Sequence, residues 1–278
     1  MNKQSNDTRT PLLHAARLVF PPLAALVVLV LTEWIARGTL DADTFAQYIE
    51  PHWEAYALAW ALLFLVWLTV DWLTRFSPLA TLVTAILGCV PAAVDFYTLQ
   101  LRGEPFLPWD LMQVSEAAGV ASAAGIHIQT SMTVSIVVVL VLTVGSFFLY
   151  RKRAKLGWPQ RVAGFSASAA AGCALVFCVF LQPAVTESLG ILPDAWMQDR
   201  YYRYYGVITS FLTNLTCRTP IETNLSLKDI FFRSKAMYKL WVRDQFTVFS
   251  PEIFVRIQQG KISSYPMKGT LDAKSEAK

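Results

Sequence analysis

Five long apolar stretches occupy much of the first 184 residues and are separated by short polar segments. A helix needs about 20 predominantly apolar residues to cross the hydrocarbon core of a membrane, and each stretch is about that long. The pattern therefore predicts an all-α, polytopic membrane protein with a five-helix transmembrane bundle over residues 18–184. The predicted spans are 18–36, 54–73, 79–99, 131–150 and 162–184.

Composition supports this reading. The chain is 54% hydrophobic and only 16% charged, whereas soluble domains have about 25% charged residues. The net charge of +4 is too small to indicate nucleic acid, so no nucleic-acid partner is predicted. The four cysteines form no CxxC or paired framework, which argues against disulfides and zinc.

The distribution of basic residues predicts the orientation, because short cytoplasmic loops are enriched in Lys and Arg. The loops on the opposite side contain only Arg37 and Arg102. Residues 1–17 are therefore predicted to be cytoplasmic, and the chain after the fifth span to be extracellular. The basic residues on the N-terminal side are Lys3, Arg9, Arg17, Arg75, Arg151, Lys152, Arg153, Lys155 and Arg161.

Several polar residues lie at or near the ends of spans, where each needs a partner. Asp95 lies deeper in the third span, and Arg102 follows two turns later on nearly the same face. Either the two side chains meet, or Arg102 leaves the helix to bind an anion. Two acid–base pairs have the i,i+4 spacing, acid first, that favours an ion pair on a helix: Glu33–Arg37 and Asp71–Arg75.

A stripe of small residues recurs every four positions in the fifth span, at Gly164, Ser168 and Gly172. Such a stripe lets a second helix approach closely, so it indicates packing within the bundle.

The segment between the third and fourth spans has more structure than a plain loop requires. Pro105 and Pro108 favour an extended or turn conformation before them. Asp110 with Gln113 forms a capping-box pattern, which predicts a short amphipathic helix at the outer surface, anchored by Trp109. A simple re-entrant connector is the alternative. The headgroup-binding candidates are Arg102, Glu104, Trp109 and Asp110.

Residues 185–257 are predicted to form a helical extracellular tail beside the membrane. A helix is expected to begin at Ser226, with Trp241 on its apolar face, and to lie on anionic lipid or to pack on its neighbour. Residues 244–257 have no assignable element, and the polar chain from 258 to 278 is predicted to be disordered. The membrane-surface candidates are Arg200, Arg203, Lys228, Arg233, Lys235, Lys239 and Arg243.

Two segments carry a resemblance to a known family. "RGEPFLPWDL", followed by "SEAAGVA", resembles an element of the lipoteichoic acid synthase family, and "DRYYRYYGVITSFLTNL" is similar to that family's stretch after the fifth span. The resemblance covers residues 15–218. It implies a bacterial cell membrane, a role in cell wall biogenesis, and phosphoglycerol transfer from phosphatidylglycerol. In that family the chemistry resides in an extracellular sulfatase-like domain with a threonine nucleophile and a divalent metal, commonly Mn²⁺.

This chain departs from that pattern after Arg218. Only 60 residues remain, too few for such a domain, and all three histidines precede the tail. No catalytic residue, metal ligand or cofactor is therefore predicted, and the chain alone is expected to be inactive. The leading hypothesis is a transmembrane anchor or partner for a separately encoded extracellular catalytic domain, with phosphatidylglycerol as its lipid.

Three alternatives remain open at this point. The chain could be a non-enzymatic scaffold that binds anionic envelope lipids through Arg102 and the basic tail, or an inactive truncated remnant. A small transporter or channel is the third, and it is disfavoured because only Asp95 approaches the membrane core.

Overall fold

The structure is a computed structural model that divides into two compact units, residues 1–218 and 219–278. It describes residues 9–113, 128–151, 153, 156–192, 197–216, 238–242, 246–250, 255–258 and 261–264.

Every described element of the first unit is helical, and five of its helices are long and apolar enough to cross a membrane. The predicted five-helix bundle is confirmed to that extent. The fifth long helix ends at Phe180, earlier than predicted, because the chain turns at Leu181 before Pro183. The elements are α1 (Arg9–Arg37), α2 (Ala42–Thr44), η1 (Phe45–Ile49), η2 (Glu50–His52), α3 (Trp53–Thr74), α4 (Ser77–Arg102), η3 (Pro108–Gln113), α6 (Thr130–Tyr150), α7 (Trp158–Leu175), η4 (Val176–Phe180), α8 (Pro183–Ser188), α9 (Gln198–Tyr205) and α10 (Val207–Asn214).

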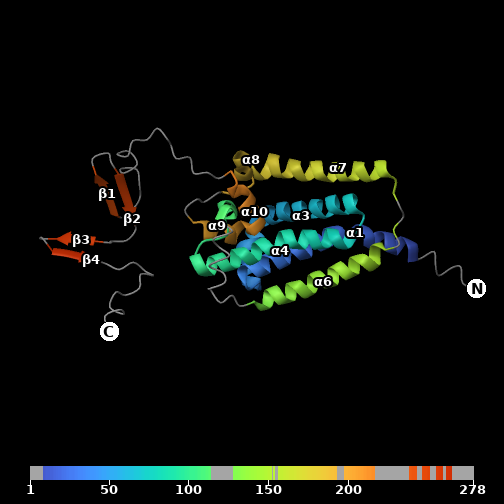
Figure 1. Cartoon of the computed structure of the whole chain (residues 1–278), viewed down its shortest axis with the longest axis horizontal. Helices are drawn as coiled ribbons and strands as arrows, with labels where there is room; N and C mark the ends of the chain where they lie inside the picture. Colours follow the sequence, from blue (N-terminus) through green and yellow to red (C-terminus); the bar gives the residue numbers. More distant parts are fainter. Residues whose placement is uncertain are drawn as a thin grey trace, which may run out of the picture. The chain divides into compact units, whose positions relative to one another are not determined.

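The long helices run alongside one another, with α1, α3 and α4 in the middle (Figure 1). Helix α6 packs on α1 and α4, and α7 packs on α3. Small residues make these contacts possible. A Cβ at Gly88 of α4 would lie 2.6 Å from Thr32 Oγ1 of α1, and one at Gly164 of α7 would overlap the Trp72 ring of α3. The predicted packing role of the stripe in the fifth span therefore holds at Gly164.

Helices α6 and α7 leave wide apolar faces uncovered by the rest of the described chain. Only a small part of the most apolar stretch of each helix is buried. Water disfavours contiguous apolar surface of this size, so these faces require an apolar environment. The large exposed side chains on these helices and η4 include Ile136, Val137, Leu140, Val141, Val144, Phe148, Trp158 and Phe177.

Helices α9 and α10 lie at the end of the bundle where α4 ends (Figure 1). Gly206 separates these two helices at a φ of +76°. Tyr201 and Tyr205 are buried, with 2% and 8% exposure. Their hydroxyl groups form hydrogen bonds with Thr213 Oγ1 and the Gly190 carbonyl. Both side chains are therefore held by contacts within the protein.

The second unit contains β-structure, which corrects the predicted helical and disordered tail. Lys239 and Trp241 lie in a strand rather than on a helix, and residue 258 ends another strand. Residues 217–237 and 265–278 lie outside the described residues. The apolar positions 238, 240 and 242 alternate, and this period of two fits a strand better than a helix. The strands form two antiparallel hairpins: β1 (Tyr238–Val242) with β2 (Phe246–Ser250), and β3 (Val255–Gln258) with β4 (Lys261–Ser264).

Candidate functional site

Polar side chains gather where α9 and α10 cover the ends of α1, α3 and α4, and we call this region the α9 end. A cavity of about 300 Å³ opens among them. Its charged lining residues are Glu33, Arg37, Asp95, Asp199 and Arg203.

The ion pair between Glu33 and Arg37 is the centre of the α9 end. The two side chains are 4% and 10% exposed, and their charged atoms lie 3.1 Å apart. Arg37 also donates to the Tyr56 hydroxyl at 2.7 Å and to the Arg203 carbonyl at 2.8 Å. The predicted i,i+4 pair is therefore present, but it is buried and holds α9 against α1 and α3.

The start of α10 approaches this pair closely. The Val207 amide donates to Glu33 Oε1 at 3.2 Å. A Cβ on Gly206 would lie 2.5 Å from the same oxygen and 2.9 Å from Tyr56 Cε1. Only glycine fits both this space and the positive φ.

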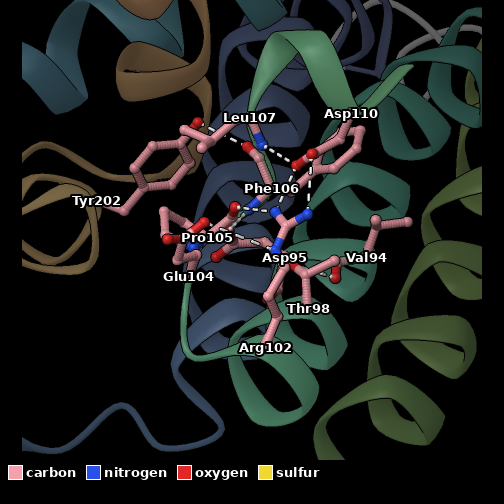
Figure 2. A network of polar contacts seen from close by, with 10 residues as sticks. All are labelled: Val94, Asp95, Thr98, Arg102, Glu104, Pro105, Phe106, Leu107, Asp110 and Tyr202. Carbon is pink, nitrogen blue, oxygen red and sulfur yellow. Dashed lines mark hydrogen bonds and ion pairs between the residues drawn. The ribbon is translucent and has the colours of Figure 1, made fainter. Parts of the chain in front are cut away.

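A second ion pair closes the turn after α4 (Figure 2). Arg102 binds both carboxylate oxygens of Asp110, at 2.9 and 2.7 Å, and also donates to the Pro105 carbonyl at 3.1 Å. The Leu107 amide donates to Asp110 at 2.8 Å. Burial alone would raise the pKa of Asp110, but the hydrogen bonds from Arg102 and Leu107 lower it below its ordinary value.

Asp95 lies behind this turn and does not meet Arg102. Its carboxylate accepts a 2.8 Å hydrogen bond from the Phe106 amide. The Phe106 carbonyl accepts one of 2.7 Å from the Tyr202 hydroxyl of α9, as Figure 2 shows. Burial raises the pKa of Tyr202, so its hydroxyl remains a donor at neutral pH. Asp95 and Tyr202 thus connect α4, the turn and α9.

The chemistry of the α9 end is that of a polar binding or bracing site. Within the parts of the chain that the structure describes, no group of three His, Cys, Asp or Glu side chains could hold a metal ion. Glu33 is engaged by Arg37 and the Val207 N–H, and Asp95 by the Phe106 N–H. These contacts position helices, and they do not assemble a nucleophile and a base.

The four predicted headgroup-binding residues lie together around the turn, but they differ in environment. Arg102 and Asp110 bind each other, whereas Glu104 and Trp109 are exposed at 65% (side chain) and 47%. The predicted capping box is wrong in detail, because Asp110 accepts from Leu107 and lies inside the 3₁₀ helix η3. Residues 114–127, which include most of the predicted amphipathic helix, lie outside the described residues. Contact with a lipid phosphate stays a prediction.

The structure describes three of the predicted membrane-surface residues, Arg200, Arg203 and Lys239. Arg200 donates to the Tyr204 hydroxyl at 3.1 Å, and Arg203 lines the cavity. Lys239 lies in β1. The remaining candidates, Lys228, Arg233, Lys235 and Arg243, are outside the described residues.

Sequence reasoning missed several residues that organise unit 1. The hydroxyl groups of Tyr56 and Tyr202 form hydrogen bonds with residues far away in the sequence, and no local spacing reveals such contacts. Asp71 pairs with Arg153 at 2.8 Å, a contact that the predicted local pattern with Arg75 does not reveal. A glycine between two aromatic-rich helical segments, such as Gly206, is the one local signal of a close approach.

Comparisons with known proteins find one protein family and two relatives. A family described as chorismate binding enzyme matches residues 204–278. An "Uncharacterized PabA-like protein" of Haemophilus influenzae is 56% identical over 64 residues, which is 23% of this chain and 20% of the relative. A second PabA-like protein, from Pasteurella multocida, is 53% identical over 64 residues with the same coverage. The chain thus spans about a fifth of these relatives' length, and no solved structure matches it.

These matches overturn the resemblance to the lipoteichoic acid synthase family. The chain matches chorismate-binding and PabA-like proteins, so the predicted anchor role in phosphoglycerol transfer and the associated sulfatase and cell-wall assignments are wrong. The physical reason is visible in the turn after α4. Arg102, Asp110 and Pro105 form a closed helix-end corner, so the pattern that suggested headgroup chemistry satisfies a structural need.

Proposed function

We propose that this chain is a multi-pass membrane protein whose helical unit anchors a segment related to chorismate-binding enzymes. The wide apolar faces of α6 and α7 support membrane insertion, because lipid would cover the surface that the described chain leaves bare. The bias of Lys and Arg supports a cytoplasmic N-terminus and an outer α9 end.

The position of the family match supports the link between the two units. The match begins at Tyr204, inside α9, and continues through the second unit. Tyr204 stacks on His52 at 5.0 Å, and its carbonyl accepts from the Tyr56 hydroxyl. The related segment therefore starts at a partly buried residue that packs against the core of the first unit, and this overlap carries the proposal.

The proposed activity is binding rather than turnover. The chain spans about a fifth of the length of the relatives that it matches, so a complete enzyme site is not expected from this segment. Chorismate is a dicarboxylate, and its recognition requires cationic or amide donors. Among the described strands of the second unit, the basic positions are Lys239, Arg256 and Lys261.

Titration of the full chain in lipid nanodiscs with chorismate, followed by calorimetry, tests this proposal. We expect saturable binding that benzoate, which has one carboxylate, matches only weakly. Gln substitutions at Lys239, Arg256 and Lys261 together are expected to abolish it. The matched control replaces two exposed arginines of α9, Arg200→Gln and Arg203→Gln, and is expected to retain it. No binding by the full chain, or equal binding by the strand variant, would contradict the assignment.

A further inference from the structure

A second cavity, of about 580 Å³, lies at the opposite ends of the helices, and we call this region the arginine end. The turn between α3 and α4, the C-terminal end of α6 and the start of α7 form its walls. Its lining includes Arg75, Arg151, Arg153 and Arg161, with Phe76 and Phe147 as apolar wall.

The charges at the arginine end are unbalanced. Among the described residues, Asp71 forms an ion pair with this cluster, and both of its oxygens are already engaged, by Arg153 at 2.8 Å and by the Ser77 hydroxyl at 2.6 Å. Among the described residues that line the cavity there is no acidic side chain. Within the part of the chain that the structure describes, one buried carboxylate thus pairs with a guanidinium group of this cluster.

Burial and neighbouring positive charges lower the pKa of Arg75. Burial and the nearby charge of Arg153 lower the pKa of Arg75, with a smaller contribution from Arg161, although Asp71 opposes them. These arginines repel one another in the structure, and an added anion would relieve that repulsion.

Two buried donors at this end have no partner among the described residues, Arg153 Nη2 and Arg161 Nε. Their guanidinium groups are otherwise held in place, because Arg153 is bound to Asp71 and Arg161 Nη2 donates to the Leu73 carbonyl at 2.7 Å. A buried donor without an acceptor is costly and rare in folded proteins. An oxyanion in the cavity would supply the missing acceptors.

We infer that the arginine end binds a phosphate group, presented by an anionic phospholipid headgroup at the membrane surface. Arginine forks match the several oxygens of a phosphate, and basic pockets between helix ends at the cytoplasmic side suit anionic headgroups. Phe76 and Phe147 provide an apolar wall that an acyl glycerol can contact. The inference rests on the first unit alone and is independent of chorismate binding by the second.

Native mass spectrometry of the full chain, released from nanodiscs of phosphatidylcholine with or without phosphatidylglycerol, tests the inference. We expect retention of phosphatidylglycerol over phosphatidylcholine. Arg151→Gln with Arg75→Asn removes two cations, and asparagine tolerates the left-handed backbone at position 75 (φ 59°). This variant is expected to weaken retention about tenfold, because it removes charge-assisted hydrogen bonds.

The matched control removes two cations from the α9 end, Arg200→Gln with Arg203→Gln, and is expected to retain the lipid. Should the double variant at the arginine end fail to fold, Arg151→Gln alone, at an exposed position, is expected to weaken retention measurably.

Inorganic phosphate is added as a competitor. Displacement of the lipid identifies the phosphate as the recognised group and admits a soluble source, whereas persistence of the lipid assigns the membrane source. Equal retention of both lipids, or equal loss in the control, would overturn the inference.

Discussion

Charged side chains are paired differently at the two ends of the helical unit. At the α9 end, Glu33 pairs with Arg37 and Asp110 with Arg102, and Asp95 accepts an amide hydrogen bond. At the arginine end, four guanidinium groups line a cavity beside the Asp71 carboxylate, and two buried donors have no acceptor among the described residues. Closed pairing fixes helices in place, whereas unbalanced charge beside a cavity leaves capacity for a ligand. The difference separates a bracing region from a binding region within one bundle.

The largest effect is expected from breaking the central pair of the α9 end. Glu33→Ala leaves the Arg37 guanidinium buried without its carboxylate, which costs about 3–5 kcal/mol of unfolding free energy. Denaturant titration in detergent, followed by circular dichroism, measures it. The control is Glu104→Ala, whose exposed side chain lies 3.8 Å from Arg102 and should change stability by about 0.5 kcal/mol or less. Equal effects would show that the α9 end is not braced by this pair.

Two glycines with the same positive φ but different ψ provide the next comparison, with ψ 4° at Gly103 and ψ 164° at Gly206. Gly206 and Gly103 have φ values of +76° and +77°, but a Cβ would meet Glu33 and Tyr56 at Gly206 and nothing within 4 Å at Gly103. Gly103→Ala should cost about 1 kcal/mol, the strain of a left-handed residue. Gly206→Ala adds a steric clash to the strain of a backbone region that is essentially restricted to glycine, and should cost about 2–4 kcal/mol. Thermal unfolding of the two variants in the same detergent compares them, and similar losses would mean that the close approach at α10 does not constrain the fold.

A smaller effect is expected at the corner formed by Arg102 and Asp110. The pair is partly exposed, at 41% and 11%, so a double-mutant cycle with Arg102→Ala and Asp110→Ala should give a coupling of about 1 kcal/mol. A coupling near zero would show that this ion pair is not needed to close the turn.

The Arg102–Asp110 pair makes the free energy of unfolding depend on pH. The pKa of Asp110 is lowered in the folded state, so its stabilising contribution is complete above the ordinary Asp pKa of about 3.9 and is lost as the pH falls through the lower folded value. The stability difference between the natural chain and Asp110→Asn should therefore be constant from about pH 7 to 5 and shrink below about pH 4. A difference that disappears near neutral pH would contradict the lowered pKa.

The sequence predicts the long helices well because an apolar run of membrane length has few alternatives. It also predicts the Glu33–Arg37 pair, since both residues lie on one helix. It misses the pairing of Asp71 with Arg153, 82 residues away, because tertiary packing decides that contact. It places Trp241 on a helix because a short apolar pattern fits periods of 3.6 and 2 almost equally, and strand pairing resolves the choice. The family resemblance fails because a helix-end corner can produce the charged and proline positions of a motif.

The central claim is that the bundle crosses a membrane with its arginine end inside and its α9 end outside. Labelling of intact cells with a membrane-impermeant maleimide tests it, in a chain whose four cysteines are replaced by serine and which carries either Glu104→Cys or Arg151→Cys, both exposed positions. The account predicts that position 104 reacts in intact cells and that position 151 reacts only after permeabilisation. Reaction at position 151 in intact cells would contradict it.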